Sequence, residues 1–221
     1  MQFANRHEAG QLLAKSLLHL KDKHPVIVAL PRGGVPVGFE IARALAAPLD
    51  VVLVRKISAP RQEHLVIGAI ADSKDPELVM ERGLISSLNV SPEFLERAKC
   101  TALKEIEGRR SVYLSGHQPV EVTGRTAIVV DDGITSQATM LAALRAIRRR
   151  DPAQLVLAVP VAPRPTLRRL HREVDEVVCL LTPTEFFAVG QFYAAFPQLR
   201  DDEVTILLAA ARDFVTPSAP A

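Results

Sequence analysis

The sequence predicts an α/β fold, in which a mostly parallel sheet is flanked by helices and interrupted by an inserted segment. Short apolar runs that are typical of buried strands alternate with amphipathic stretches of helical length. The loops that follow several of these runs carry charged or small polar residues, which places those residues at the carboxyl edge of the sheet. The 221 residues suffice for a single domain, residues 1–221, with an insertion.

The first part of the sheet is predicted on either side of one helix. The apolar run PVIVAL (Pro25–Leu30) indicates a short buried strand, and a helix is expected from about Val35 to Ala46. The next strand is expected over residues 49–57 (LDVVLVRKI), where two cations lie near its end. This order of strand, loop, helix and strand favours parallel pairing.

The middle of the chain, residues 58–119, breaks the alternation and is expected to form a flap inserted between sheet strands. Within it, LVIGAIAD is compatible with a strand, while Ser91 followed by Pro92 and Glu93 predicts the start of a helix. Beyond the flap, the sheet resumes with Ala127–Val130, continues with QLVLAVPV and closes with EVVCLL, the last expected buried strand.

The composition restricts the setting and the partners of the protein. Hydrophobic residues make up 48% and charged residues 24%, as in ordinary globular proteins. The net charge of +2 and the pI near 8.7 are too weak a bias to indicate a nucleic-acid partner. No stretch approaches the ~20 apolar residues of a transmembrane helix, and the two cysteines show no metal-ligand spacing. We therefore expect a cytoplasmic protein without membrane or nucleic-acid partners.

The stretch TAIVVDDGITSQATM (residues 126–140) carries the strongest functional signal. A buried strand runs into two acids, Asp131 and Asp132, and then into small hydroxyl residues at the expected start of a helix. Backbone N–H groups at a helix N-terminus, joined by hydroxyls, favour a phosphate, and paired carboxylates accept hydrogen bonds from a sugar diol. A turn followed by a capped helix is the simpler alternative, but it accounts for only one acid and one hydroxyl.

Two further segments at the same edge allow both a structural and a functional interpretation. In PRGGVPVG, Gly33 and Gly34 let a ligand approach the backbone closely, although a tight turn alone also explains them. Their spacing argues against a dinucleotide-binding loop and against a P-loop. Arg55 and Lys56 follow a strand, where two solvated cations are common.

The segment AIVVDDGITSQAT resembles the signature of the type I phosphoribosyltransferases, which bind phosphoribosyl pyrophosphate (PRPP) with two acids and a hydroxyl-rich loop. The resemblance implies that Asp131 and Asp132 hold the ribose hydroxyls. It also implies that the 5-phosphate is surrounded by a loop, which consists of Thr135, Ser136, Gln137, Ala138 and Thr139. Gln137 stands where the family usually has glycine. If that position requires a positive φ, a side chain there costs ~1–2 kcal/mol and also crowds the phosphate.

The resemblance extends to the other loops. It implies that pyrophosphate is bound by Arg32, Gly33, Gly34, Arg55 and Lys56. A C-terminal hood segment, residues 182–200, would stack Phe186 or Phe187 on a base beside Val189, although these phenylalanines fit a hydrophobic core equally well. Two acids of the purine enzymes are missing, so hypoxanthine and guanine are not the expected substrates. Together the motifs resemble a group of uncharacterised predicted phosphoribosyltransferases.

By this resemblance, the expected function is transfer of the ribose 5-phosphate of PRPP to an unidentified nitrogenous base, with release of pyrophosphate. The catalytic residues would be Asp131, Asp132, Arg32 and Lys56. Mg²⁺ would accompany PRPP, held mainly by substrate oxygens and water, and the family commonly forms homodimers. The alternative is a non-catalytic module that senses PRPP or a nucleotide and regulates a partner.

Overall fold

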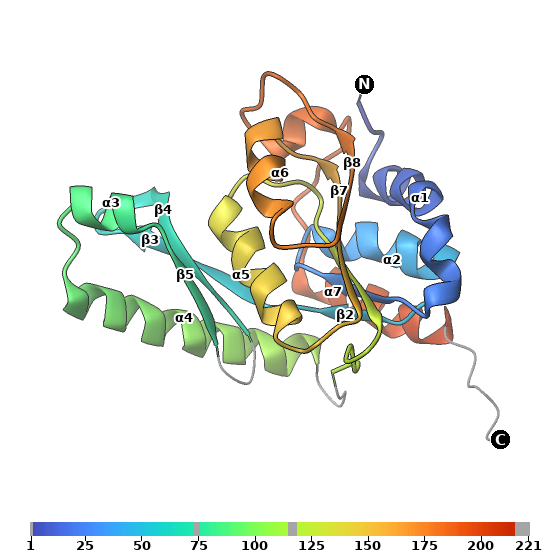
Figure 1. Ribbon diagram of the computed structural model, residues 1–221, viewed down its shortest axis with the longest axis horizontal. Helices are drawn as coiled ribbons and strands as arrows, with labels where there is room; N and C mark the ends of the chain where they lie inside the picture. The colour runs from blue at the N-terminus through green and yellow to red at the C-terminus, as the bar shows by residue number, and fades with distance from the viewer. Residues whose placement is uncertain (1, 73–75, 115–118, 215–221) are drawn as a thin grey trace.

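The computed structural model describes residues 2–72, 76–114 and 119–214, whose strands form two separate sheets (Figure 1). The larger sheet has five parallel strands, which confirms the expected α/β class. Their order in space is β2 (Leu49–Val51), β1 (Val26–Ala29), β6 (Thr126–Val130), β7 (Gln154–Val161) and β8 (Glu176–Leu181).

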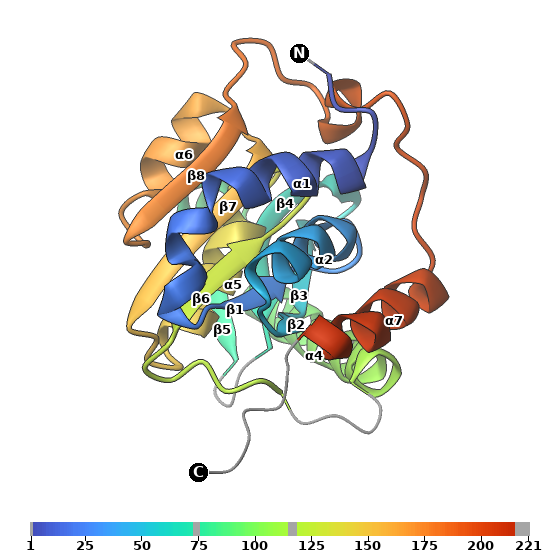
Figure 2. The ribbon, with the colours of Figure 1, turned by 90° about the vertical axis from the view of Figure 1, so that its right-hand side faces the viewer.

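Helices cover both faces of this sheet (Figure 2). One face packs against α1 (Arg6–Ser16) and α2 (Gly34–Leu45), and the other against α5 (Gln137–Arg148) and α6 (Arg164–Leu170). Because side chains alternate between the faces of a strand, Ile128 packs on the α2 side while its neighbour Val129 packs on the α5 side. Burial on both faces explains why these strands are continuous apolar runs in the sequence.

One further helix of the body lies near an edge of the sheet. The helix α7 (Asp201–Ala210) packs beside β2 and α2. The described residues also contain the short 3₁₀ turns η1 (Leu18–Lys23), η2 (Val189–Phe192) and η3 (Ala211–Phe214). Within the described ranges, no helix combines the length and the apolar character required to cross a membrane.

The segment between β2 and β6 forms an arm that extends to one side of the body (Figure 1). It contains an antiparallel sheet and two helices: β3 (Val54–Ala59), β4 (Gln62–Ala71), β5 (Glu77–Met80), α3 (Arg82–Ser87) and α4 (Pro92–Tyr113). As predicted, Ser91 caps α4, because its Oγ accepts a hydrogen bond from the Phe94 N–H at 3.2 Å. Residues 73–75 and 115–118 of the predicted flap lie outside the described residues.

The prediction of one strand over residues 49–57 is wrong. The segment divides into β2, which pairs with β1, and β3, which pairs with β4 in the arm. The chain changes partners at Val52 and Leu53, so the arm begins at Val54 and not at residue 58. An apolar run does not reveal where its pairing partner changes. The expected burial of EVVCLL also needs correction, because β8 is an edge strand whose six residues are all half-buried.

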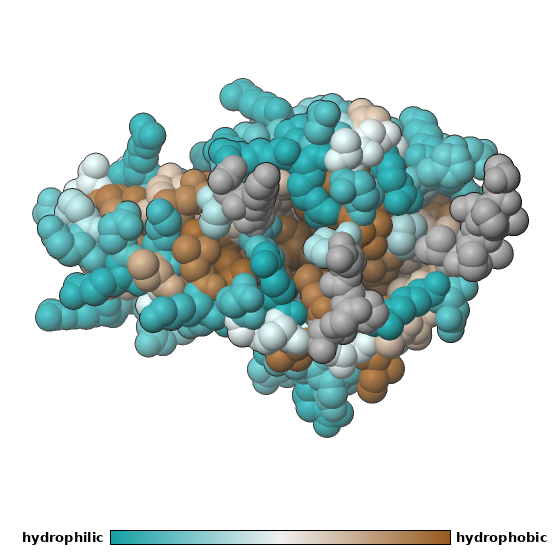
Figure 3. All heavy atoms as spheres, turned by 90° about the horizontal axis from the view of Figure 1, so that it is seen from below, coloured by the Kyte–Doolittle hydropathy of each residue, from teal (hydrophilic) through white to brown (hydrophobic). Residues whose placement is uncertain are grey.

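The arm is packed against the body through small side chains. Ala138, Ala142 and Ala146 of α5 contact Ala69 and Ala71 of β4, so the two elements approach closely. On the other side of the arm, the Tyr113 hydroxyl of α4 donates a hydrogen bond to Asp201 of α7. Seen from below, the surface is largely hydrophilic, and apolar residues gather along the arm and where it joins the body (Figure 3). Helix α5 packs on the parallel sheet with one face and on β4 with another, so it lies between the two sheets.

Candidate active site

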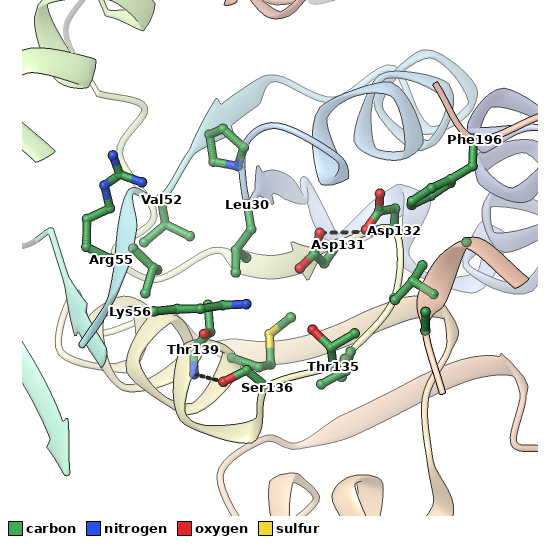
Figure 4. Close-up of a pocket in the computed structure, with 18 of the residues that line it drawn as sticks. Leu30, Val52, Arg55, Lys56, Asp131, Asp132, Thr135, Ser136, Thr139 and Phe196 are labelled. Atoms are coloured by element: carbon green, nitrogen blue, oxygen red, sulfur yellow. Dashed lines mark hydrogen bonds between the residues drawn. The ribbon is translucent and has the colours of Figure 1, made fainter. Parts of the chain in front are cut away.

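A cavity of about 520 Å³ opens at the carboxyl edge of the parallel sheet (Figure 4). The ends of β1 and β6 and the start of α5 form its centre, while the arm and the segment around Val189 form its walls. Open α/β sheets bind ligands at this edge, because the loops that follow parallel strands converge there. Its position makes it the candidate active site.

Asp131 and Asp132 follow β6 directly and line this cavity. The backbone N–H of Asp132 donates to Oδ1 of Asp131 at 2.8 Å, which fixes the first carboxylate. Burial, and next the charge of Asp132, raise the pKa of Asp131 well above its usual value. Burial also raises the pKa of Asp132, although a hydrogen bond from Arg6 opposes this shift. The surroundings of both acids therefore disfavour the charged carboxylate unless a cation or a hydrogen-bond donor stabilises it.

Arg6, near the start of α1, is a site residue that the sequence interpretation missed. Its Nε lies 2.7 Å from Oδ2 of Asp132, and its Nη1 donates to the Pro197 carbonyl at 2.9 Å. The guanidinium also stacks on Phe196, with Cζ 3.7 Å from the ring centroid. The Tyr193 hydroxyl donates to the Asp132 carbonyl at 2.6 Å. The N-terminal helix and the segment around residue 196 thus meet on Asp132.

The first loop, which joins β1 to α2, can pass close to Asp132 because glycine occupies positions 33 and 34. A Cβ on Gly33 would lie 2.0 Å from Oδ2 of Asp132, and one on Gly34 would lie 2.6 Å from the Val130 carbonyl. A side chain at Gly34 would clash with the backbone of β6, and one at Gly33 would displace either the loop or the Asp132 carboxylate. The peptide bond between Pro31 and Arg32 is cis.

The predicted 5-phosphate loop leads into α5. Ser136 is the N-cap residue, and its Oγ accepts from the Thr139 N–H at 3.5 Å, which is long for a hydrogen bond. The side chains of Thr135, Ser136 and Thr139 line the cavity. Among the described residues, Oγ1 of Thr139 is buried and has no hydrogen-bond partner. An orphaned hydroxyl beside a helix N-terminus is suited to a bound anion.

Gln137 does not obstruct the cavity. It is the first residue of α5 and therefore has a helical conformation, so the strain expected from a positive φ does not arise. Its Oε1 accepts a hydrogen bond from Nη1 of Arg169 on α6 at 3.1 Å, away from the cavity lining. Ala138 also faces elsewhere, because it packs on the arm sheet. These two residues leave only their backbone for a ligand.

The predicted pyrophosphate cations have different surroundings. Lys56 extends across the cavity toward Asp131 (Figure 4). Arg55 lines the same cavity, but its Nε lies 2.9 Å from Oε2 of Glu105, in an orientation that makes an ion pair and not a hydrogen bond. Arg32 lines a neighbouring cavity of about 320 Å³, where its Nη1 lies 3.9 Å from Oδ1 of Asp201.

The hood segment supplies one predicted residue to the cavity. Val189 lines it and packs on Gly133, where a Cβ would lie only 2.8 Å from the valine methyl groups. Phe186 instead stacks on Phe192, with centroids 5.5 Å apart, and the side chain of Phe187 is 87% exposed. The structure therefore places neither predicted aromatic residue on the cavity wall.

Phe196 is the aromatic residue that lines the cavity. The sequence shows a cluster of phenylalanines in this segment but not which ring turns inward. Glu105 and Arg109 on α4 also line the cavity, and no local motif marked them, because the arm helix reaches the site only through the tertiary fold.

Comparisons with known proteins agree with this arrangement. The family model of the phosphoribosyl transferase domain matches residues 4–196, so the chain belongs to the phosphoribosyltransferase family. The chain is 42% identical over 213 residues to the Mycobacterium tuberculosis H37Rv protein named "Putative phosphoribosyl transferase Rv0571c", covering 96% of this chain and 48% of that protein. The chain thus spans about half the length of the curated relatives it matches.

Among solved structures, the chain is similar to the protein TT1426 from Thermus thermophilus. The TM-score is 0.80 at 35% sequence identity, and the similarity covers 98% of this chain and 100% of that one. The similarity includes the arm as well as the parallel sheet. The resemblance and the fold class predicted from the sequence are confirmed.

Proposed function

We propose that this protein transfers the ribose 5-phosphate group of PRPP to a nitrogenous base and releases pyrophosphate. One observation carries the proposal: the acids Asp131 and Asp132, three hydroxyl side chains at a helix N-terminus and the amine of Lys56 share one cavity. These groups are complementary to a ribose diol, a phosphate and a pyrophosphate on a single small molecule.

The proposed binding mode uses the residues as the cavity presents them. Asp131 and Asp132 would accept hydrogen bonds from the ribose 2- and 3-hydroxyls. The start of α5, with Thr135, Ser136 and Thr139, would surround the 5-phosphate. This placement supplies Oγ1 of Thr139 with the partner that it lacks in the described chain.

In the proposed reaction, the bond from the sugar C1 to pyrophosphate breaks and a bond from C1 to a base nitrogen forms. The base loses a proton to water or to the departing pyrophosphate. The sugar becomes cation-like in the transition state, so the protein contributes by fixing the ring and stabilising the negative charge of the leaving group. The arm and the apolar side chains of Val189 and Phe196 would limit the access of water to C1.

Mg²⁺ is proposed to enter with PRPP. Within the described residues, no group of three or more His, Cys, Asp or Glu side chains is arranged to hold a metal ion. Asp131 is the carboxylate left to meet such an ion, because Asp132 is paired with Arg6. This donor set fits Mg²⁺, which keeps most of its ligands from substrate and water. When bound, the ion would offset negative charge on the pyrophosphate.

The experiment measures pyrophosphate release from PRPP and Mg²⁺ with a panel of purine, pyrimidine and pyridine bases. Asp131→Asn is the test variant, because Asp132 also holds Arg6, and its replacement would disturb the contact of the N-terminal helix with the segment around Phe196. The control, Asp22→Asn, removes an exposed acid far from the cavity lining. Base-dependent release that is lost in Asp131→Asn and kept in Asp22→Asn supports the enzyme.

The sensing alternative makes a different prediction in the same assay. PRPP would bind, as measured by calorimetry, but no base would cause pyrophosphate release. That result would replace transfer by regulation as the function of the site. Absence of both PRPP binding and turnover would contradict both functions.

A further inference from the structure

The cations of the site differ in whether they already have an acidic partner. Arg55 is paired with Glu105, and Arg32 lies near Asp201 in the neighbouring cavity. Lys56 and Arg109 line the main cavity, and in the described part of the chain neither lies within ion-pair distance of a carboxylate. An anion that binds to these two side chains therefore does not have to displace an acidic partner.

Arg109 is held in place by the arm helix. Glu105 and Arg109 are four residues apart on α4, so they share one face of the helix, and both line the cavity. The helix is anchored on the body by the buried side chains of Ala102 and Ile106. One turn beyond Arg109, the Tyr113 hydroxyl donates to Asp201. The half-buried guanidinium therefore projects from a fixed helix and not from a loose loop.

Arg32 has an acidic neighbour, Asp201, which is not part of the main cavity lining. Asp201 accepts the hydrogen bond of Tyr113 and lies 3.9 Å from Arg32, which keeps Arg32 on the α7 side of the first loop. Asp131 and Asp132 place acidic groups at the centre of the cavity, which is less favourable for a polyphosphate than a position between cations. The favourable electrostatic environment for its negative charge is the arm side, where Lys56 and Arg109 are unpaired.

We propose that Arg109, together with Lys56, is the principal cation that binds the pyrophosphate group of PRPP, so that the inserted arm completes the site. This inference rests on the proposed function. It assigns a binding role to α4, for which the sequence motifs carry no signal. The planar guanidinium suits a diphosphate, because it donates two parallel hydrogen bonds to phosphate oxygens.

The test compares the affinities of PRPP and ribose 5-phosphate, which differ in the pyrophosphate group, by calorimetry with Mg²⁺ present. The variants are Arg109→Gln, Arg32→Gln and Lys104→Gln. Lys104 is the matched control, since it is an exposed cation on the same helix outside the cavity lining. We expect Arg109→Gln to weaken PRPP at least about tenfold and to leave ribose 5-phosphate within about twofold. Arg32→Gln should weaken PRPP less, and Lys104→Gln should change neither affinity.

Retained affinity for ribose 5-phosphate also reports that each variant is folded. The inference is overturned if Arg109→Gln binds PRPP like the wild type, or loses both ligands equally. It is also overturned if Arg32→Gln or Lys104→Gln weakens PRPP as much as Arg109→Gln does. A wild-type protein that binds neither ligand would contradict the proposed function itself, which is a separate failure.

Discussion

Arg6 donates a hydrogen bond from Nε to Oδ2 of Asp132 at 2.7 Å, and both side chains are nearly buried, with 10% and 13% of their surfaces exposed. The pair joins the N-terminal helix to the end of β6, 126 residues away along the chain. Because Arg6 also contacts Phe196 and the Pro197 carbonyl, one guanidinium connects three segments around the cavity. The N-terminal helix is thus part of the site as well as of the fold.

Replacing Arg6 should destabilise the protein strongly. Arg6→Met leaves Asp132 buried without its cation, and breaking a buried pair from one side costs about 3–5 kcal/mol. Urea unfolding measures the loss. The exposed pair of Arg200 with Asp202 provides the control, because Arg200→Met should cost less than about 1 kcal/mol. Equal losses for the two variants would show that the Arg6 pair contributes no more than a surface contact.

The pKa of Asp131 predicts an unusual pH dependence of stability. Burial raises this pKa, so between its unfolded and folded values the native state binds more protons than the unfolded state, and stability falls as pH rises through that interval. Asp131→Asn removes this penalty. We expect the variant to melt at a higher temperature than the wild type at pH 7, with the difference shrinking toward pH 4. A constant difference at all pH values would contradict the shift.

Replacing Thr139 is expected to increase the stability of the protein and to weaken its binding of PRPP. Its Oγ1 is buried without a partner in the described chain, so Thr139→Val replaces a costly hydroxyl by a methyl group of similar size. Removing such an unsatisfied group should stabilise the protein by roughly 1 kcal/mol, whereas PRPP affinity should fall about tenfold. Thermal melts and calorimetry test the two parts. A variant that binds PRPP with wild-type affinity would show that the hydroxyl does not meet the phosphate.

Gln137 should have little influence on the ligand. Its side chain contacts Arg169 and lies outside the cavity lining, so Gln137→Gly should change PRPP affinity by less than about twofold. The variant loses that contact and gains backbone freedom at the helix start, which should cost up to about 1 kcal/mol in stability. A large gain in affinity would mean that the glutamine side chain obstructs the phosphate after all.

The sequence predicted the features that depend on local patterns. The buried strands β1, β6 and β7 are continuous apolar runs, the cap at Ser91 follows from residue type, and the acids after β6 fall at the carboxyl edge. The same reasoning could not locate the change of sheet at Val52, because apolar residues suit either sheet. Nor could it show that β8 lies at an edge, which depends on the order of strands in space.

The candidate site was predictable where a sequence motif or the family resemblance covered its residues, as with Asp131, Thr139 and Lys56. Asp131 and Thr139 lie in one short stretch that runs from the end of β6 into α5, so a single motif identified both. Arg109 and Phe196 line the cavity and Arg6 contacts Asp132 beside it. They come from three distant segments, and each contact exists only in the folded chain. Phe187 illustrates the converse, because its place in an aromatic cluster suggested a base contact although the side chain points into solvent.

The central claim is that this cavity holds PRPP with its 5-phosphate at the start of α5. A crystal structure of the wild-type protein soaked with PRPP and Mg²⁺ tests it most directly. The account predicts a phosphate within hydrogen-bond distance of Oγ1 of Thr139 and ribose hydroxyls on Asp131. Density for PRPP at another place, with the start of α5 empty and Asp131 without a sugar contact, would contradict it.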